Sequence, residues 1–266
     1  GSNGLEIQVG HTLGTREPAL WFPNRHDLVN HYNIGITGTM GTGKTQLVKS
    51  LLAQLLLFPE HNAGGRRPGL LIFDYKGDYI EGQRDRWAEC VGARVLQPED
   101  LPLNPIRPQL PQSRQQHVIM QREFAATIQT IVPRMGEVQR GQLLQGLRMA
   151  FERAGVDPRR RETWDRPAPT LHDLLEILRE EDLAAGVPRA VISDLAELGI
   201  FAEEDPGTSL DDFFDGVHVI NLKRLSGTPD VIKAVVAFFC NAFYARMIQR
   251  GEPRFEDRSA SGGHTS

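Results

Sequence analysis

The sequence predicts an α/β fold with a mostly parallel sheet, an all-helical insertion and a short N-terminal β-hairpin. Three observations support this prediction. An apolar run at 69–74 ends in a carboxylate, four helical patterns follow one another within 112–198, and strand character returns at 217–222. Strands that alternate with helices are typical of a parallel sheet, because parallel neighbours need a long crossover connection.

The N-terminal region, residues 4–30, is predicted to hold the hairpin. Two short segments, 5–9 and 19–22, flank a turn that contains glycine, and their apolar and polar residues alternate. Alternation with a period of two is typical of strands that bury one face. We therefore expect these two segments to pair.

Residues 38–45 are the most informative part of the chain. Their sequence, GTMGTGKT, satisfies every fixed position of the phosphate-binding pattern G-x-x-x-x-G-K-[ST]. Glycines let backbone N–H groups turn inward around a polyphosphate, and a following helix directs its partly positive N-terminus at the same anion. Lys44 is expected to reach the β and γ phosphates of a nucleotide, and Thr45 to bind Mg²⁺. The alternative is a glycine-rich surface turn that contains a lysine by chance.

The context of this loop supports nucleotide binding. The segment 32–37 is predicted to be a strand, and apolar residues recur at helical spacing from Leu47 to Leu57 until Pro59 stops the pattern. Gln46 either reaches the α phosphate or a sensor contact, or is simply exposed on the helix. The residues predicted to bind ATP are Gly38, Thr39, Met40, Gly41, Thr42, Gly43, Lys44, Thr45 and Gln46.

The apolar run at 69–74 is predicted to be a strand buried on both faces of the sheet. The segment DYKGDY, 74–79, follows at the carboxyl end of this strand, the edge where open α/β sheets bind ligands. Asp74 and Asp78 are therefore candidates for activating the attacking water, and Asp74 for contacting Mg²⁺. The alternative that Asp74 caps a turn, with 76–78 as a solvent-facing bend, stays open.

The remainder of the chain is mostly helical. Residues 87–92 are predicted to form a short helix, 93–96 a third strand, and the proline-rich stretch 101–111 an irregular connection. Further helices are expected at 115–132, 137–154, 170–181, 189–198 and 229–250, with Thr170 and Asp173 as a capping box. The predicted domains are a hairpin region (4–30), a nucleotide-binding core (31–111 and 213–250), a helical insertion (112–212) and a disordered polar tail (251–266).

Composition is that of a soluble globular protein. The 266 residues are 40% hydrophobic and 24% charged, with a mean hydropathy of −0.34. We expect no stretch of about 18 apolar residues, which a membrane span needs, and no signal peptide, and hence a cytoplasmic location. A net charge of −4 argues against a surface coated in positive charge for nonspecific duplex binding. Cys90 and Cys240 are far apart, and neither a disulfide nor a metal site is indicated.

Arginines and lysines are possible contacts to phosphate. Oligomeric motors usually need an arginine from a neighbouring subunit to neutralise transition-state charge. For any single arginine on a helix, a solvated position is the simpler explanation. Candidates for that role are Arg134, Arg140, Arg148, Arg153, Arg159, Arg160 and Arg161, and candidates for DNA contact are Arg66, Arg67, Lys76, Arg84, Lys223 and Arg224.

The order of the phosphate loop, the DYKGDY segment, the turn at 103–105 and the strand at 219–222 resembles the HerA/FtsK superfamily of hexameric DNA-pumping ATPases. Those proteins carry a similar D-x-[KH]-G-[DE] signature after their second strand. Within the superfamily, residues 35–39 and 73–79 look most like the ATPase of a DNA phosphorothioation-dependent restriction system, an anti-phage defence.

This resemblance, which covers most of 33–248, implies a particular function. It implies an ATP-hydrolysing motor that uses Mg²⁺ and forms a homo-oligomeric, hexameric ring. It also implies that the motor translocates DNA with other subunits of a defence or DNA-processing complex. In the superfamily, an apolar strand ending in Asp-Glu follows the element that corresponds to 217–250. The sequence before Ser266 holds no such run, so we expect a part of a larger ATPase in which binding is a safer expectation than hydrolysis.

Two alternatives remain open from the sequence. One is a secretion or conjugation ATPase that moves protein or single-stranded DNA across a membrane. The other is a nucleotide-dependent switch or assembly subunit with little turnover.

Overall fold

The computed structural model describes residues 5–25, 33–62, 65–80, 82–108, 113–201 and 210–251. These residues fall into two compact units, each treated separately below. The first unit lies within Gly1–Gly69, Glu81–Gly92 and Arg250–Ser266, and the second within Leu70–Ile80 and Ala93–Gln249.

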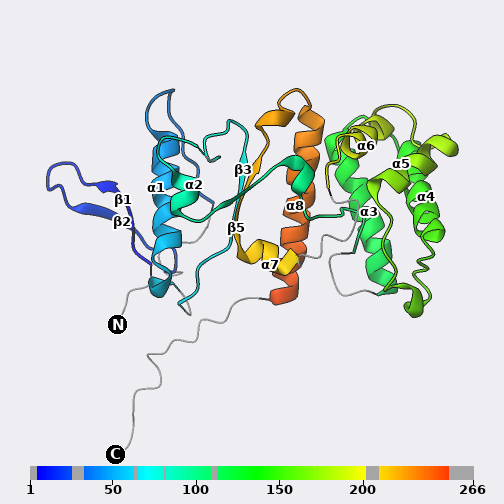
Figure 1. Ribbon diagram of the computed structural model, residues 1–266, viewed down its shortest axis with the longest axis horizontal. Coiled ribbons are helices and arrows are strands. Elements are labelled where there is room, and N and C mark those ends of the chain that lie inside the picture. The colour runs from blue at the N-terminus through cyan, green and yellow to red at the C-terminus, as the bar shows by residue number, and fades with distance from the viewer. Residues whose placement is uncertain are drawn as a thin grey trace, which may run out of the picture. The chain divides into compact units, whose positions relative to one another are not determined.

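The first unit combines a hairpin with the helix that follows the phosphate loop (Figure 1). The strands β1 and β2 pair antiparallel, which confirms the predicted hairpin. Gln54 holds the hairpin on α1: its side-chain oxygen accepts from the Gln8 amide at 2.8 Å and its nitrogen donates to the Gln8 carbonyl at 3.1 Å. The elements of this unit are β1 (Ile7–His11), β2 (Pro18–Trp21), α1 (Lys44–Leu57), a 3-10 turn (Pro59–His61) and α2 (Trp87–Cys90).

The strand predicted at 32–37 is not formed. Residue 32 lies outside the described residues, and residues 33–37 form neither a strand nor a helix. A strand is held by hydrogen bonds to a neighbour, and among the strands that the structure describes, none pairs with this segment. The local pattern identified a segment suited to a strand but did not supply a partner.

The second unit contains a parallel sheet of three strands. Its members are β3 (Leu70–Asp74), β4 (Arg94–Leu96) and β5 (Val217–Asn221), in the order β3-β5-β4. Both pairings are parallel, as predicted. The central strand β5 is the buried one, whereas residues 70–73 of β3 are only half-buried. The prediction that β3 is buried on both faces is therefore wrong, because β3 lies at an edge of this sheet.

Helices make up most of the second unit. The predicted helices are confirmed with shifts of a residue or two, and Thr170 and Asp173 form the predicted capping box at the start of α5. The helices are α3 (Arg114–Ile131), α4 (Glu137–Arg153), α5 (Leu171–Glu180), α6 (Val187–Glu197), α7 (Leu210–Asp215) and α8 (Pro229–Arg250), with 3-10 turns at Pro98–Asp100, Arg161–Thr163 and Lys223–Leu225.

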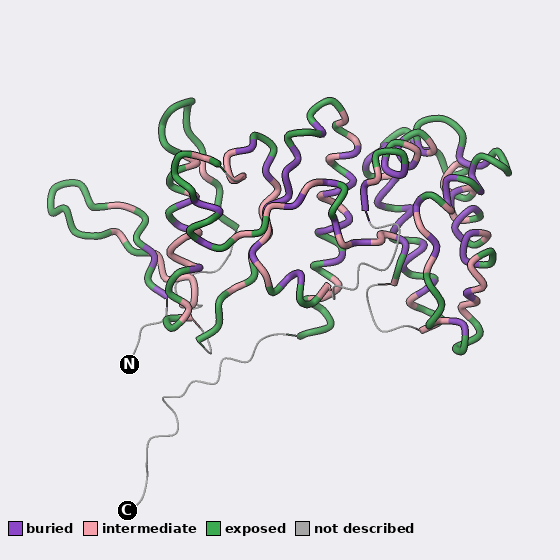
Figure 2. Tube along the Cα trace, in the orientation of Figure 1, coloured by how far each residue is buried: buried purple, intermediate pink, exposed green. Residues whose placement is uncertain are grey.

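One hydrophobic core runs from the sheet through these helices. Helix α8 joins its two parts: Phe239 meets Phe73 of β3 edge to face at 6.4 Å between ring centroids, and Phe238 stacks on Phe124 of α3 at 5.2 Å. Buried residues, purple in Figure 2, recur along these elements. The sheet and the helices of the predicted insertion therefore share one core, and the insertion boundary at 112–212 stays a prediction.

Helix α8 is long and apolar, contrary to the expectation about membrane spans. The helix has 22 residues, and its most apolar window has a mean hydropathy of 1.6. By length and composition alone, it could cross a membrane. The expectation that no stretch of this kind exists is therefore wrong. The first half of the helix is needed in the core of the second unit, where Val235, Phe238 and Phe239 are buried. Core helices pass the same test, so the finding is weak evidence for a membrane.

Candidate functional site

The phosphate loop has the backbone that its glycines predict. Gly41 and Gly43 have φ values of 79° and 82°, a left-handed region that strains residues with a Cβ. Helix α1 begins directly after Gly43, and the Leu47 amide donates to the Gly43 carbonyl at 2.9 Å. Gly38 is needed for a different reason, since a Cβ there would lie 2.8 Å from the Thr42 hydroxyl.

The Lys44 side chain folds back across the loop. Its ammonium donates to the Thr39 carbonyl at 2.5 Å, and the Thr42 hydroxyl donates to the same carbonyl at 2.8 Å. An ammonium has three donors, so this contact leaves capacity for phosphate oxygens. The Lys44 ammonium therefore already lies against the loop backbone, where a polyphosphate would bind.

The residues of the loop fit a triphosphate with Mg²⁺. The loop is exposed from Gly38 to Gly43, so a ligand can reach it. The first turn of α1 holds no acidic residue, and no side chain caps its N-terminus. The partly positive helix end is thus not neutralised by its own first turn. Thr45, the second residue of the helix, is placed in that turn to offer a hydroxyl to the metal.

An ion pair between a buried lysine and a partly exposed aspartate lies on another face of the same helix. The Lys49 ammonium donates to Asp85 Oδ2 at 2.6 Å, with 6% of the Lys49 side chain exposed and 31% of the Asp85 side chain. Gln46 donates to the same oxygen at 3.3 Å. The hydrogen bond from Lys49 is the main reason that the pKa of Asp85 lies below its ordinary value. The Gln46 side chain is thus engaged with Asp85 rather than simply exposed.

Asp74 organises the turn that follows β3. Its Oδ1 accepts from the amides of Lys76, Gly77 and Asp78 at 3.2, 2.8 and 3.1 Å, and its Oδ2 accepts from the Tyr79 amide at 2.8 Å. The residue is 4% exposed. This geometry favours the turn-capping alternative, because both carboxylate oxygens are occupied by backbone donors.

The carboxyl edge of the sheet adds further polar groups to this turn. Gly77 has φ 79°, and a Cβ there would lie 3.0 Å from Lys223 Cδ, so the lysine stem passes directly over the glycine. Asn221, at the end of β5, donates to Gln97 Oε1 at 3.3 Å and accepts from the Lys223 amide at 3.2 Å. Two of the residues predicted to contact DNA are thus found here: Lys76 within the DYKGDY turn and Lys223 beside it.

The predicted site residues fall into two groups. The structure brings together 38–46 in one loop and helix start, within the first unit, whereas Asp74 and Asp78 belong to the second unit. Each group is built by local chain geometry.

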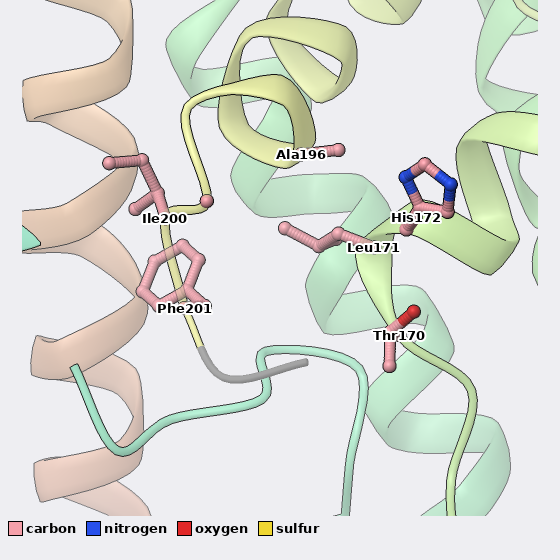
Figure 3. A pocket seen from close by; sticks show the side chains of 7 residues that line it. Thr170, Leu171, His172, Ala196, Ile200 and Phe201 are labelled. Atoms are coloured by element: carbon pink, nitrogen blue, oxygen red, sulfur yellow. The ribbon is translucent and has the colours of Figure 1, made fainter. Parts of the chain in front are cut away.

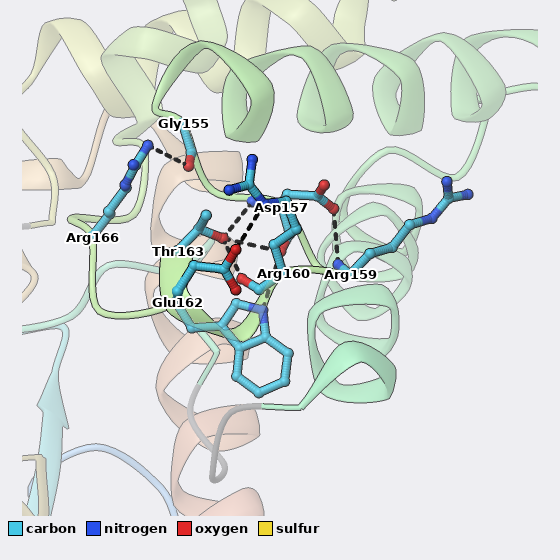
Figure 4. Close-up of polar contacts among 8 residues, drawn as sticks. Gly155, Asp157, Arg159, Arg160, Glu162, Thr163 and Arg166 are labelled. Atoms are coloured by element: carbon cyan, nitrogen blue, oxygen red, sulfur yellow. Dashed lines mark hydrogen bonds and ion pairs between the residues drawn. The ribbon is translucent and has the colours of Figure 1, made fainter.

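Several candidate arginines are tied to neighbouring acids. Arg153 pairs with Glu180 at 2.6 Å. The run 159–161 lies in a tight turn, where the Arg159 amide donates to Asp157 and the Arg160 side chain pairs with Glu162 at 2.9 Å (Figure 4). The structure therefore gives local partners to some of these arginines and does not single out one of them for phosphate.

A small pocket lies elsewhere in the second unit, between the start of α5 and the end of α6 (Figure 3). Its polar group at the α5 end, the Thr170 hydroxyl, already takes part in the capping box with Asp173. The pocket is mostly apolar and carries no chemistry of its own. Its lining residues are Thr170, Leu171, His172, Ala196, Gly199, Ile200 and Phe201.

The sequence analysis missed the pair of Lys49 and Asp85. A signal existed, since Lys49 is the one charged residue within the apolar stretch 47–57 of α1. Its partner is 36 residues away in sequence, and no local pattern connects the two. Only the folded chain identifies which acid neutralises this lysine.

Comparison with known proteins bears on the family and the fold of this chain. Residues 27–139 match the family described as "Helicase HerA, central domain". Comparison with curated protein sequences gives no match. Among solved structures, VirB4 of Thermoanaerobacter pseudethanolicus is similar in fold, with a TM-score of 0.62 and 16% identity over 92% of this chain. The chain spans 65% of the length of that structure.

These findings confirm the predicted fold class and the resemblance at the level of the superfamily, while the closer likeness to a restriction-system ATPase is not confirmed. Residues 27–139 carry a HerA-type central-domain sequence, within a chain whose fold is similar to that of the P-loop ATPases of the HerA and FtsK type.

Proposed function

We propose that this chain is the ATP-binding and ATP-hydrolysing part of a HerA/FtsK-type motor. The observation that carries the proposal is the phosphate loop itself. Gly41 and Gly43 hold left-handed backbone, Lys44 lies across the loop, and a helix begins directly behind it. This combination of inward amides, a cation and a helix N-terminus is suited to a polyphosphate.

Each residue of the loop has a distinct part in binding. The loop amides and the Lys44 ammonium bind the β and γ phosphates, and the Thr45 hydroxyl holds Mg²⁺. When bound, Mg²⁺ neutralises charge that develops on the phosphate oxygens. Lys44 gives up or shares its contact with the Thr39 carbonyl as a phosphate arrives. Positioning and charge neutralisation are the main sources of catalysis in phosphoryl transfer.

The carboxylate that orients the attacking water is a separate part of the proposal. Asp74 has both oxygens engaged by backbone amides, so we assign it to shaping the turn that carries Asp78. Asp78 stays the candidate for contact with water or with the outer shell of Mg²⁺.

The motor we propose acts on DNA as a homo-oligomeric, hexameric ring in the cytoplasm, as part of DNA processing or phosphorothioation-dependent restriction. The HerA-type sequence at 27–139 and the fold similarity support this proposal. The similarity to VirB4 rests on fold at 16% identity, so the choice of DNA as cargo comes from the sequence resemblance.

Replacement of Lys44 tests the proposal. Lys44→Ala removes the ammonium that binds phosphates, and we expect a loss of MgATP affinity of at least about a hundredfold, or about 2.7 kcal/mol. The loss of one contact on an exposed loop costs at most about 1 kcal/mol of stability. A fluorescent ATP analogue with Mg²⁺ measures the affinity, and thermal unfolding measures the stability.

Lys233→Ala is the matched control. Lys233 is a lysine on α8 with 60% of its side chain exposed and one 2.9 Å contact, to Asp230. Its removal is expected to leave MgATP affinity unchanged. Equal affinity of wild type and Lys44→Ala would refute the site. Phosphate release at steady state separates a motor from a nucleotide-dependent switch, which binds ATP with little turnover.

A further inference from the structure

Two side chains on one face of the helix behind the phosphate loop donate to the same carboxylate, that of Asp85. Gln46 and Lys49 are three residues apart, so they share a face of α1. Both donate to Asp85 Oδ2, at 3.3 and 2.6 Å. Successive residues of a helix are rotated by about 100°, which puts this face roughly opposite to Lys44 and next to Thr45.

Asp85 also binds the next element of the chain. Its Oδ1 accepts from the Trp87 amide at 3.2 Å, at the start of α2, and the Trp87 indole donates to the Lys49 carbonyl at 2.9 Å. One carboxylate thus links the backbone at α2 to two side chains of α1. All these groups lie within the first unit.

The Lys49 and Trp87 ends of this link are shielded from water, whereas 31% of the Asp85 side chain is exposed. Only 6% of the Lys49 side chain is exposed, and Trp87 is 6% exposed. A buried ammonium must keep its partner, since a buried charge without one is strongly unfavourable. The contact therefore restricts how far α1 can rotate about its own axis.

Rotation of α1 would disturb the phosphate loop directly. The helix begins at Lys44, so the loop and the first-turn amides move with it. A group about 6 Å from the helix axis moves by about 2 Å when the helix rotates by about 20°. That displacement is large compared with the tolerance of a hydrogen bond.

We propose that Asp85 is a positioning residue of the phosphate loop: by accepting from Gln46 and Lys49 it fixes the rotation of α1, and with it the direction in which Lys44, Thr45 and the first-turn amides meet a triphosphate. The inference rests on the proposed nucleotide binding and adds a residue to that site. Gln46 then acts through Asp85 rather than as a phosphate ligand.

Two variants of the full chain test this proposal. Asp85→Asn removes the charge that the buried Lys49 ammonium contacts at 2.6 Å, so it also lowers stability. The double variant Lys49→Met with Asp85→Asn removes both charges, so the buried lysine charge is no longer there to need a partner. We expect the double variant to fold and to lack the ion pair that holds α1.

Asp215→Asn is the matched control. Asp215 accepts from Arg246 at 2.7 Å, with 10% of the Arg246 side chain exposed and 57% of the Asp215 side chain. Like Lys49, Arg246 is a largely shielded cation paired with a carboxylate, but it also pairs with Asp211 at 2.6 Å and lies in the second unit. Because Arg246 keeps its contact with Asp211, Asp215→Asn tests whether weakening an ion pair outside the first unit lowers MgATP affinity in general.

The measurement is the affinity for MgATP well below the unfolding midpoint, with circular dichroism confirming that each variant is folded. We expect both Asp85 variants to bind about tenfold more weakly than wild type, and Asp215→Asn to bind as wild type does. Hydrogen exchange at the Leu47 amide, which donates to Gly43, is expected to be faster in both Asp85 variants only.

The outcomes separate the two proposals. Wild-type affinity in the folded double variant would overturn the positioning role and leave nucleotide binding intact. An equal loss of affinity in Asp215→Asn would also overturn it, since the effect would then be general. Failure of the wild type itself to bind MgATP would overturn the proposed function and this inference with it.

Discussion

Asp74→Ala is expected to destabilise the second unit by about 3 kcal/mol, because the carboxylate caps four backbone amides. An unsatisfied buried donor costs about 1–3 kcal/mol. Lys76 is exposed, so its amide regains water, whereas Gly77 is buried and its 2.8 Å bond to Asp74 is lost outright. We count one to two amides as unsatisfied, which gives about 3 kcal/mol, or roughly 6–12 °C in Tm.

Asp74→Asn is expected to fall between wild type and Asp74→Ala. An amide keeps one acceptor oxygen for the amides of residues 76–78, but its nitrogen then faces the Tyr79 N–H, which now donates to Oδ2 at 2.8 Å. Two donors cannot satisfy each other. Asp165→Asn, at an exposed carboxylate of the same unit, is the control and is expected to keep wild-type stability.

Thermal unfolding and hydrogen exchange at the Gly77 amide measure the effect. An Asp74→Ala variant that unfolds at the wild-type temperature would refute the capping role. A different result would support the catalytic alternative: an Asp74→Asn variant of wild-type stability that binds MgATP but releases no phosphate.

Two further predictions concern the helices. The His117 ring is 2% exposed and lies against Phe151 and Trp164. This burial lowers the pKa of His117 from 6.5, so the unfolded chain binds the proton more readily than the folded chain does. Stability is full above pH 6.5 and falls as pH drops toward the folded-state pKa; urea unfolding at about pH 7.5 and about pH 5.5 should show a smaller loss in His117→Leu than in wild type. Thr170→Ala removes the hydroxyl that accepts from the Asp173 amide at 3.2 Å and should cost about 1 kcal/mol, whereas Thr170→Ser should cost less; equal unfolding curves for wild type and Thr170→Ala would contradict the cap.

Features that depend on a few neighbouring residues could be predicted from the sequence. The phosphate loop needs left-handed backbone, which glycine alone adopts freely, and Gly41 and Gly43 have it. The capping box of Thr170 and Asp173 is likewise a relation between residues three apart. Helix boundaries follow from periodicity and from caps of this kind, so they too were close to the prediction.

Features that depend on distant partners could not be predicted. Residues 33–37 have the composition of a strand but no strand partner among the described residues. β3 is as apolar as β5, yet only β5 is central and buried. The pairing of Lys49 with Asp85 joins residues 36 apart. In each case the sequence shows that a residue needs a partner, and only the three-dimensional structure shows which one.

The phosphate loop and the DYKGDY segment differ in how many hydrogen bonds hold their charged side chains, Lys44 and Asp74. Lys44 makes one contact, to the Thr39 carbonyl, on a loop whose residues 38–43 are exposed. Asp74 is buried, and four amides hold it. A ligand can displace a single exposed hydrogen bond at a cost of about 1 kcal/mol, whereas releasing Asp74 would break its hydrogen bonds to four backbone amides. The lysine is thus available to a phosphate in a way that the aspartate is not available to a metal or a water. This difference is why we propose ligand binding for the first motif, and support of the sheet edge for Asp74 in the second.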